Sequence, residues 1–514
     1  MGEARLKRKL PESEVHGKRA PLDLSPEEFR ELGHHVAERI AEFLQSLPSK
    51  PVAPNESATF LRQLIDVPLP EHGEAPDVLL DCAMDLLEQH STFNSHPRFW
   101  GYITGSPAPI GALGDFIASA LNPNLGKWML APIGAEIERQ TVGWIAQMLR
   151  FPDDCGGLLV SGGSMANFIG FLAARRAKLP WSVRSSGMLG DHRPLPRIYT
   201  STETHVWVQK AADLFGLGTD SIRWIPTDEN YRMDVDELRK RVDQDLKSGD
   251  FPFLLIGTAG SVGTGAVDPL PELAEISRAY KLWFHVDGAY GGFAALASEA
   301  PQDLRGLATA DSVAVDPHKW LFAPLEAGCA LVRNRLDLHQ TFSYRPQYYH
   351  LAGDPADDAI NYFEYGPQNA RGFRALKVWL CLRQAGLHGY REMIGNNIRL
   401  AGQLYGLVKA QPDMEALTCS LSITTFRYVP TDLKGRSDAD DYLNQLNSEL
   451  LTRIQQGGKA FISNAVLRGK FALRACIVNF RTSLADLQAL VELVVLVGTE
   501  LDAQLRPAAA RTAD

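Results

Sequence analysis

A lysine in the second half of the chain stands where it could act as a nucleophile. Residues 311–322 read DSVAVDPHKWLF, and the apolar run at 313–315 predicts a buried strand that ends shortly before Lys319. Apolar residues follow at 320–322. A buried ammonium is costly unless it is paired or neutralised, and desolvation favours the free amine. Such an amine can form a Schiff base with a carbonyl compound, although a loop lysine whose stem packs on an aromatic ring would explain the same residues.

Three more groups of polar residues follow other predicted strands. Gly162, Gly163 and Ser164 connect a strand to a helix, and backbone N–H groups at a helix N-terminus bind phosphate. His205 follows a second strand, and Asp287 stands at the end of a third. A serine–glycine turn that only caps its helix, and a histidine with a structural role, would explain the first two groups. A carboxylate at the mouth of a buried strand needs a cationic or hydrogen-bonding partner, so we expect one for Asp287.

The elements that must position these residues alternate between strands and helices. Strands are predicted at 156–160, 197–200, 253–258, 282–286 and 313–315, and helices at 165–178 and 270–280. This alternation is typical of an α/β domain with a mostly parallel sheet, in which ligands bind beyond the carboxyl ends of the strands. Ser164, His205, Thr258, Asp287 and Lys319 all fall at that edge, so we expect them to meet in one site.

Such a site suits pyridoxal 5'-phosphate, which is therefore the expected cofactor. Its aldehyde would form an imine with Lys319, and Asp287 would keep its pyridine nitrogen protonated, so that the ring accepts electrons from a carbanion. The glycine-rich turn at 162–164 would hold its phosphate, and His205 would stack on its ring.

Composition and charge limit the classes of function. The chain has 514 residues, of which 45% are hydrophobic and 22% are charged, which is enough apolar material for a large core and a second domain. A net charge of -9 does not favour a nucleic acid or an anionic membrane as a partner. The six cysteines are scattered singly, so we expect free core thiols and no metal site. No apolar run is long enough to span a membrane and no apolar stretch of a secretory signal is visible, which predicts a cytoplasmic location.

The sequence predicts four segments. Residues 1–20 form a basic disordered tail, 21–100 an N-terminal helical segment, 101–399 the large cofactor-binding domain and 400–514 a small α+β C-terminal domain. Within the helical segment, SPEE at 25–28 predicts a capping box, and residues 29–47 carry apolar side chains at helical spacing. A proline-rich connection follows, so this helix can pack on another subunit as easily as on its own chain.

The chain resembles the pyridoxal-phosphate-dependent group II amino acid decarboxylases, a family that includes aromatic-L-amino-acid, glutamate and cysteine sulfinate decarboxylases. The resemblance rests on HVDGAY at 285–290 and PHKW at 317–320, with Thr204-His205 and GGS at 162–164 in the expected order. It extends over most of the chain. It implies the type I pyridoxal-phosphate-dependent transferase fold and a homodimer with both active sites at the interface, in which the N-terminal helix is swapped between subunits.

The resemblance also implies a role for each site residue. Lys319 would bind the cofactor as an imine, Asp287 would contact the pyridine nitrogen, and His318 would neighbour the imine. The cofactor ring would lie between His205 on one face and Ala289 on the other. An amino acid would replace the lysine in the imine, and the bond held perpendicular to the ring would then break.

The identity of the broken bond decides the reaction. If the α-carboxylate is perpendicular, carbon dioxide leaves; a loop tyrosine, best matched by Tyr348 and next by Tyr349, would then protonate the carbanion to give an amine. Aldehyde-forming relatives tend to lack this hydroxyl, so Tyr348 favours a decarboxylase. An aldehyde synthase, a lyase or an aminotransferase on the same fold is an alternative, as is a catalytically silent binding protein. A dinucleotide-binding protein is disfavoured, because no G-x-G-x-x-G motif opens a βαβ unit.

An aromatic L-amino acid is a slightly better match as substrate than an acidic one such as glutamate, aspartate or cysteine sulfinate. Trp100, Tyr102 and Ile103 are expected to line the pocket, whereas Arg98 would suit a second carboxylate. The preference therefore depends on which of these side chains reach the pocket.

Three places depart from the family pattern. Asp316 stands where the aromatic members usually carry asparagine, which puts a phosphate contact from that position in doubt. Val206 and Trp207 follow His205 in place of small hydroxyl residues. Gly126 stands where aromatic decarboxylases tend to have a ring, so we expect a reshaped substrate pocket.

Overall fold

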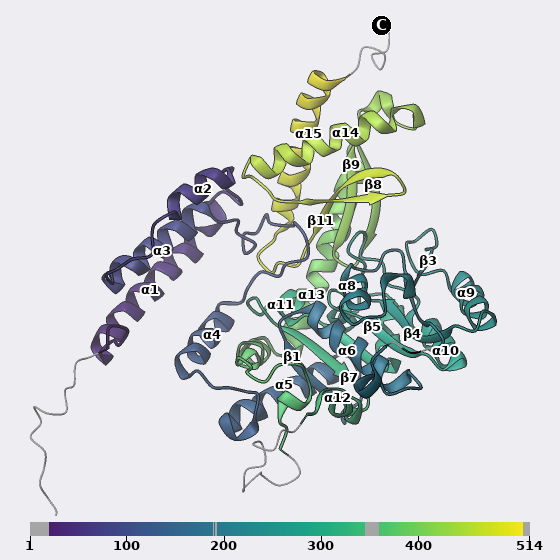
Figure 1. Cartoon of the computed structure of the whole chain (residues 1–514). Coiled ribbons are helices and arrows are strands. Elements are labelled where there is room, and N and C mark those ends of the chain that lie inside the picture. Colours follow the sequence, from purple (N-terminus) through teal and green to yellow (C-terminus); the bar gives the residue numbers. More distant parts are fainter. Residues whose placement is uncertain (1–19, 189, 191–192, 345–358, 507–514) are drawn as a thin grey trace, which may run out of the picture. The chain divides into compact units, whose positions relative to one another are not determined.

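The computed structural model describes residues 20–188, 190, 193–344 and 359–506 (Figure 1). The chain forms two compact units, Met1–Phe93 and Asn94–Asp514. Tyr348 and Tyr349 lie outside the described residues, as does most of the tail predicted at 1–20.

Three α-helices make up the described part of the smaller unit. They are α1 (Pro26–Ser46), α2 (Ala58–Ile65) and α3 (Pro76–His90), with a short 3-10 turn, η2 (Leu47–Ser49), after α1. α1 begins with the predicted capping box, in which the Glu28 N–H donates to the Ser25 hydroxyl and the Ser25 N–H donates to the Glu28 carboxylate. Arg39 joins α1 to α3, because its guanidinium lies 2.9 Å from Asp81 and 2.7 Å from Asp85.

A seven-stranded sheet forms the centre of the larger unit (Figure 1). Its strands are β1 (Gly156–Val160), β2 (Pro196–Ser201), β3 (Ile222–Ile225), β4 (Phe251–Thr258), β5 (Trp283–Asp287), β6 (Ser312–Val315) and β7 (Gly328–Val332). They lie in the order β1-β7-β6-β5-β4-β2-β3, and every neighbouring pair is parallel except the two pairs that include β7. The mostly parallel sheet confirms the predicted α/β class.

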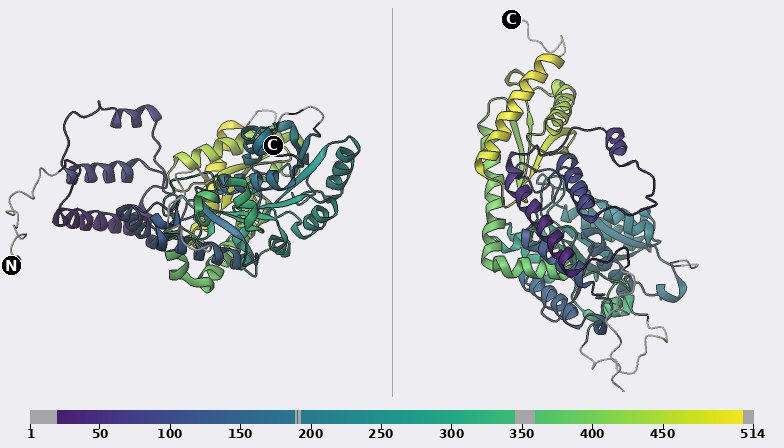
Figure 2. Two further views of the ribbon diagram at one scale, coloured as in Figure 1. Left: turned by 60° about the horizontal axis from the view of Figure 1, so that its bottom comes forward. Right: turned by 90° about the vertical axis from the view of Figure 1, so that its left-hand side faces the viewer.

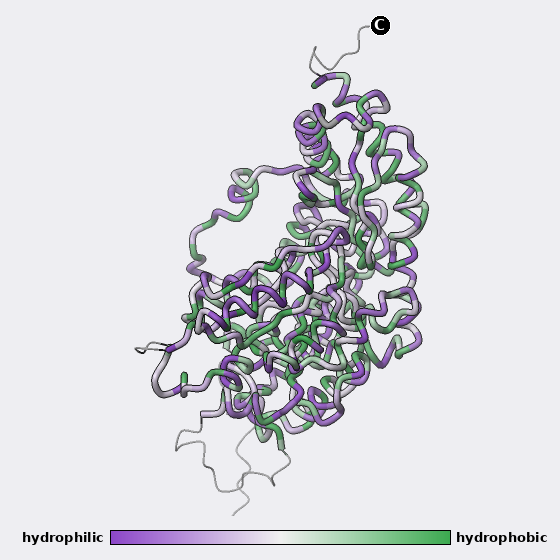
Figure 3. The backbone as a smooth tube through the Cα atoms, turned by 90° about the vertical axis from the view of Figure 1, so that its right-hand side faces the viewer, coloured by the Kyte–Doolittle hydropathy of each residue, from purple (hydrophilic) through white to green (hydrophobic). Residues whose placement is uncertain are grey.

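Helices cover both faces of this sheet (Figures 1 and 2). The helices of this part are α4 (Pro109–Leu121), α5 (Pro132–Met148), α6 (Gly163–Lys178), α7 (Val183–Ser186), α8 (Trp207–Leu214), α9 (Val235–Lys247), α10 (Leu270–Tyr280), α11 (Pro317–Trp320) and α12 (Arg335–Phe342). Leu254 and Ile256 of β4 pack in one buried cluster with α6 and α8, whereas Leu255 packs in another with α5 and α10. Successive strand residues point to opposite faces, so β4 buries apolar side chains on both. Figure 3 shows such hydrophobic segments in green within the unit.

A second, four-stranded antiparallel sheet lies nearer the C-terminus (Figure 1). It consists of β8 (Met414–Ser420), β9 (Ile423–Tyr428), β10 (Ser463–Leu467) and β11 (Lys470–Cys476), accompanied by α14 (Asp440–Gln456) and α15 (Leu484–Leu505). In this region the sequence predicts strands at 422–428 and 471–478 and a helix from residue 484, which correspond to β9, β11 and α15; it does not predict β8, β10 or α14. Short 3-10 turns complete the larger unit: η3 (Trp128–Leu130), η4 (Thr219–Ser221), η5 (Gly292–Leu296), η6 (Gln302–Thr309), η8 (Tyr362–Glu364), η9 (Thr431–Leu433) and η10 (Ser437–Ala439). This α+β region agrees with the fold class predicted for the C-terminal part.

One long helix crosses the position at which the sequence placed a domain boundary. α13 (Arg374–Ala410) bends at Gly386, whose φ of 62° lies in the left-handed region that favours glycine. It contacts α4 and α5 of the large α/β region and also β8 and β9 of the second sheet. The predicted boundary at 399/400 therefore falls within a helix that packs on both regions.

The prediction of core thiols holds for only part of the cysteines. Cys329, Cys381 and Cys476 are buried, whereas Cys82 and Cys419 are exposed. Cys82 is exposed because it lies on α3, a helix in which no residue is buried. None of the described helices is both long enough and apolar enough to cross a membrane.

Candidate active site

A cavity of about 450 Å³ lies where the chain leaves β1, β2, β4, β5 and β6. Nine predicted site residues lie within the described part of the chain, and all of them line this cavity: Gly162, Gly163, Ser164, His205, Thr258, Asp287, Ala289, His318 and Lys319. Parallel strands end at the same edge of a sheet, which explains how residues more than a hundred positions apart come together.

Lys319 lies on the single turn of α11, and its ammonium is paired. Its Nζ is 2.9 Å from Asp316 Oδ2, and the exposed fractions of the two side chains are 17% and 2%. Asp316 directly follows β6, and its Oδ1 is buried with no hydrogen-bond partner among the described residues. The sequence marked Asp316 only as a departure from a family pattern, whereas the structure shows that it is the partner of the lysine.

The start of α6 forms a cradle that only glycine permits. Gly162 precedes the helix with a φ of 139°, and no side chain caps the helix at this end. A Cβ on Gly163 would lie 2.7 Å from Asp316 Oδ2 and 2.9 Å from the Ala289 Cβ. The first backbone N–H groups of α6 therefore remain available to an anion such as phosphate.

Asp287 ends β5 and is 7% exposed. Its Oδ2 accepts a 2.7 Å hydrogen bond from the Trp207 indole Nε1–H, and its Oδ1 accepts a 3.1 Å bond from the Ala289 backbone N–H. Two donors orient the carboxylate, which still has lone pairs for a protonated ring nitrogen. Sequence reasoning missed the contact of Trp207, because 80 positions separate the indole from the carboxylate.

Two histidines border the cavity in environments that disfavour the imidazolium form. The pKa of His205 is lowered, mainly by burial and also by the positive charge of Lys319. The negative charge of Asp287 offsets part of this effect. Burial also lowers the pKa of His318, whose Nδ1 lies 2.7 Å from the Ala327 carbonyl oxygen. Both rings are therefore neutral at pH 7, and a neutral ring at position 205 suits stacking on an aromatic cofactor.

Comparison with known proteins places these residues in a family. Residues 59–429 match the model of the pyridoxal-dependent decarboxylase conserved domain. The chain belongs to the pyridoxal-dependent decarboxylases. An aromatic-L-amino-acid decarboxylase of Bacillus atrophaeus is 36% identical to this chain over 467 residues, which are 91% of this chain and 94% of that protein.

Two further similarities bear on the reaction. A phenylacetaldehyde synthase of Arabidopsis thaliana is 30% identical to this chain over 466 residues, which are 89% of this chain and 92% of that protein. The crystal structure of Oryza sativa TDC with PLP and tryptamine matches with a TM-score of 0.87 and 26% identity, covering 94% of this chain and 99% of that chain. The decarboxylase is thus a pyridoxal-phosphate-dependent enzyme of the type I fold that acts on an amino acid.

The site of the decarboxylase fits this cofactor. The glycine cradle at α6 suits its phosphate, the buried Asp287 suits its ring nitrogen, and the amine of Lys319 suits its aldehyde. These groups line one cavity and come from separate strand ends.

Thr258 is held by a buried network. Its hydroxyl lies 3.2 Å from that of Thr204, which lies 2.6 Å from that of Thr200. Its backbone N–H donates to Asp268 Oδ2 over 2.8 Å, and burial raises the pKa of Asp268 to about 6. The end of β4 is therefore fixed from two sides, which positions Thr258 at the cavity wall.

Behind the cavity, His285 lies in a chain of polar groups. The Trp283 indole N–H donates to Ser312 Oγ over 2.8 Å, and this hydroxyl lies 2.7 Å from His285 Nδ1. His285 Nε2 lies 2.7 Å from Asn167 Oδ1. The arrangement assigns the proton of the neutral ring to Nε2, because Nδ1 must accept from the hydroxyl while Asn167 Oδ1 can only accept.

Acidification is expected to destabilise the decarboxylase through His285. Burial lowers its pKa from 6.5 to about 4, so between these values the unfolded chain binds a proton that the folded state excludes. Stability then falls as the pH drops, by about 1.4 kcal/mol per pH unit for one such group. Asp268 acts in the opposite direction below pH 6, because its raised pKa lets the folded state bind the extra proton.

A substitution isolates the contribution of His285. Urea unfolding of His285→Gln at pH 7 and pH 5 should show a loss on acidification that is about 2 kcal/mol smaller than that of the unaltered protein. The contribution of Asp268 to the pH dependence of stability cancels in this comparison, because both proteins retain Asp268. Equal losses in the two proteins would contradict the assignment.

The structure corrects the predicted substrate pocket. Ile103 lines the cavity, but Trp100 and Tyr102 are not among its lining residues. Trp100 is fully buried and donates its indole N–H to Thr482 over 3.1 Å, whereas Tyr102 is 64% exposed. The apolar and aromatic character of residues 100–103 therefore does not by itself describe the pocket.

Two other sequence observations about the pocket gain a structural explanation. The charge of Arg98 is matched by Asp486, which lies 2.9 Å away. Arg98 also does not line the cavity. A Cβ on Gly126 would lie 1.8 Å from the Asn369 carbonyl oxygen, so no ring fits at this position.

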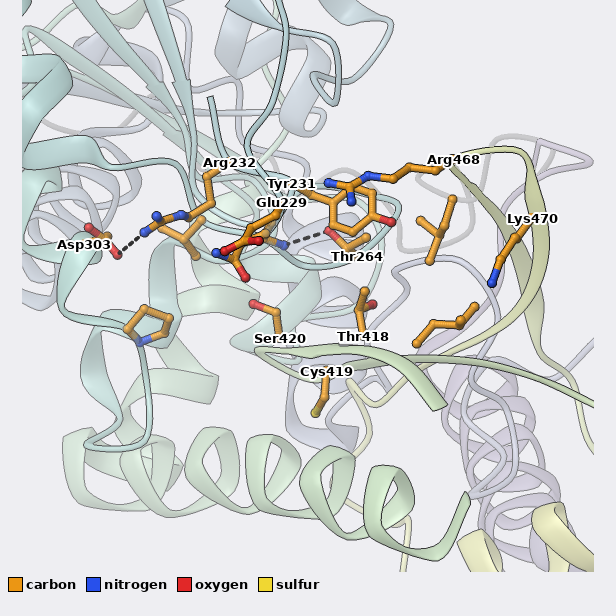
Figure 4. Close-up of a pocket in the computed structure, with 16 residues that line it drawn as sticks. Glu229, Tyr231, Arg232, Thr264, Asp303, Thr418, Cys419, Ser420, Arg468 and Lys470 are labelled. Atoms are coloured by element: carbon orange, nitrogen blue, oxygen red, sulfur yellow. Dashed lines mark hydrogen bonds and ion pairs between the residues drawn. The ribbon is translucent and has the colours of Figure 1, made fainter. Parts of the chain in front are cut away.

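A larger cavity, of about 680 Å³, lies elsewhere in the same unit (Figure 4). None of the predicted site residues lines it. Figure 4 shows Arg232 directed toward Asp303, 3.9 Å away, and Lys470 lies 3.3 Å from Glu415. These charged side chains are matched by opposite charges, so the greater volume does not mark the reactive site.

Proposed function

We propose that the decarboxylase converts an aromatic L-amino acid to its amine and carbon dioxide. The observation that carries this proposal is the lining of the cavity. Apart from Lys319, no lysine or arginine among the described residues lines it, so the cavity wall within one subunit offers no fixed cation to a second substrate carboxylate. Ile103, Met165, Val262 and Leu325 provide apolar surface instead. The similarity to an aromatic-L-amino-acid decarboxylase supports the same substrate class.

The site residues are assigned the following roles in this proposal. Bound pyridoxal phosphate supplies an electron sink for the negative charge left on the α-carbon. Lys319 holds the cofactor covalently, and Asp287 keeps a proton on the ring nitrogen. Residues 162–164 bind the phosphate, while His205 and Ala289 enclose the ring and exclude water from its two faces. His318 neighbours the nitrogen of Lys319 in this arrangement.

A substrate screen tests the proposal. The purified protein with added pyridoxal phosphate should release carbon dioxide from tyrosine, tryptophan, phenylalanine or dihydroxyphenylalanine at least about tenfold faster, in kcat/KM, than from glutamate, aspartate or cysteine sulfinate. Release from the acidic substrates alone would favour the acidic-substrate alternative. A protein that binds the cofactor but releases no carbon dioxide from any of these would be the catalytically silent alternative.

Tyr348 is assigned the protonation that completes amine formation, although it lies outside the described residues. Tyr348→Phe is expected to shift products from the amine toward the aldehyde, with oxygen as the oxidant, because the variant lacks the O–H that quenches the carbanion. Amine and aldehyde can be quantified together by chromatography. Tyr349→Phe is the matched control, and an unchanged amine yield from Tyr348→Phe would refute the assignment. The aldehyde-forming alternative has its own support in the similarity to phenylacetaldehyde synthase.

We also propose a homodimer with both active sites at the interface, in which the predicted segment 21–100 is swapped between subunits. In the smaller unit, no residue of α1 is buried, and the exposed fractions of Phe29 and Ile40 are 48% and 43%. In the larger unit, α4 exposes Phe116 and Leu121 by 52% and 74%. Apolar faces of this kind are typical of surfaces covered by another chain. A cytoplasmic location and the tail predicted at 1–20 stay predictions from the sequence.

A further inference from the structure

The carboxylate of Asp287 depends on few partners. Among the described residues, only the Trp207 indole N–H and the Ala289 backbone N–H donate to it, and no lysine or arginine forms an ion pair with it. A carboxylate that is 7% exposed is costly to ionise without such donors. The indole bond, at 2.7 Å, is the shorter of the two.

Trp207 cannot easily turn away from this bond. It is fully buried, and it occupies the first position of α8. Its ring packs edge-on against the His285 imidazole at a centroid distance of 5.7 Å and an angle of 78°. His285 is itself fixed by Ser312 and Asn167. The N–H group therefore already points at the carboxylate before any ligand binds.

The strand geometry explains why one indole reaches both partners. His285 and Asp287 are two positions apart on β5, so their side chains point to the same face of the sheet. Trp207 comes from α8, which packs on that face with α6. The indole thus links the rigid polar chain around His285, on the same face of the sheet, to a carboxylate that lines the cavity.

We propose that Trp207 is a positioning residue that fixes the plane of the Asp287 carboxylate and keeps it ionised, and so maintains the proton on the ring nitrogen of the bound cofactor. The inference rests on the role proposed for Asp287. With the indole N–H and the Ala289 N–H taking one lone pair each, a remaining lone pair faces the cavity for the ring N–H. No bond to Trp207 forms or breaks in the reaction.

A matched pair of substitutions tests the proposal. Trp207→Phe removes the N–H while keeping an aromatic side chain, and Trp100→Phe makes the same change at another fully buried indole, which donates to Thr482 outside the cavity. Both variants should lower the thermal midpoint of the cofactor-free protein. Only Trp207→Phe should raise the dissociation constant of pyridoxal phosphate, by about tenfold, since it alone loses a hydrogen bond to a charged group at the site.

A spectroscopic measurement separates a positioning role from packing. Cofactor labelled with ¹⁵N in its ring should show a pyridinium chemical shift in the unaltered protein and in Trp100→Phe, and a shift toward neutral pyridine in Trp207→Phe. Site-specific incorporation of 3-benzothienylalanine at position 207 keeps the size of the indole but replaces N–H with sulfur. This replacement should reproduce the effect of Trp207→Phe.

The outcomes are distinct. A pyridinium shift and cofactor affinity that survive in both Trp207 variants would overturn the proposal and leave Trp207 as packing only. A benzothienyl variant that behaves like the unaltered protein while Trp207→Phe does not would also overturn it, because volume and not the N–H would then matter. If the unaltered protein forms no borohydride-reducible imine with pyridoxal phosphate, it is the proposed function of the site that fails.

Discussion

Replacing Lys319 with alanine is expected to abolish amine formation, with a fall in kcat of roughly a thousandfold or more. The amine of this lysine is the only lysine nitrogen that lines the cavity in the described part of the chain. Without it, the cofactor can bind only through non-covalent contacts and must react with free substrate. The measurement is the visible imine absorbance of the purified protein, before and after borohydride, together with the rate of amine formation.

The same substitution should have a second effect, on stability. Asp316 is 2% exposed, and Lys319 is its ion-pair partner at 2.9 Å. Removing the ammonium leaves the buried carboxylate with only the neutral His318 ring, whose Nε2 lies 3.6 Å from Asp316 Oδ2, and this should lower the free energy of unfolding of the cofactor-free protein by about 1–3 kcal/mol. We place the effect below that of a fully buried pair because the Lys319 side chain is 17% exposed.

A double substitution provides the control for this effect. Lys319→Ala combined with Asp316→Asn should regain most of the lost stability, because the amide carries no charge, but it should not regain the imine. An imine band that persists in Lys319→Ala would show that another lysine holds the cofactor. An unchanged unfolding free energy in that variant would show that the pair with Asp316 does not contribute to stability.

The sequence predicts that these residues lie close together because of how parallel sheets are built, and the described ones do line one cavity. Each of Ser164, His205, Asp287 and Lys319 follows an apolar run, and the ends of such strands share one edge. No knowledge of side-chain contacts was needed to expect that they meet. The regular alternation of strands and helices predicted the fold class for the same reason, since β4 is apolar on both faces.

The features of the site that the sequence did not predict are contacts between residues far apart in the chain. Trp207 lies 80 positions from Asp287, and Arg98 lies 388 positions from Asp486. No local sequence pattern indicates that Trp207 donates a hydrogen bond to Asp287, or that Arg98 pairs with Asp486 instead of lining the pocket. Only the packing of α8 on the sheet and of residues 94–100 near α15 brings them together.

The unpredicted elements of the second sheet have a local explanation. β10 alternates between buried and exposed residues over only five positions, and most residues of β8 are only partly buried. Short strands with one solvated face carry weak apolar patterns. The sequence predicts separate helices at 373–382 and from about residue 400, whereas α13 continues through both and bends at Gly386.

The largest effect on folding is expected from Arg371, which lies away from the cavity. Its Nη1 is 3.0 Å from Glu138 Oε2 and its Nη2 is 2.5 Å from Glu138 Oε1, and both side chains are almost completely buried. Arg371 also donates to the Leu159 carbonyl oxygen, while Glu138 accepts from the Leu159 N–H. One ion pair thus connects the loop before α13, helix α5 and strand β1.

Arg371→Met should therefore lower the free energy of unfolding by about 3–5 kcal/mol, because it leaves the Glu138 carboxylate buried without its cation. Arg139→Met is the matched control, because Arg139 directly follows Glu138 in α5. Its pair with Glu136 has side chains that are 58% and 40% exposed, so this change should cost less than about 1 kcal/mol. Urea unfolding of both variants, with cofactor absent, measures the difference. Similar losses in the two variants would mean that burial does not set the contribution of the Arg371 pair, and that the three elements hold together without it.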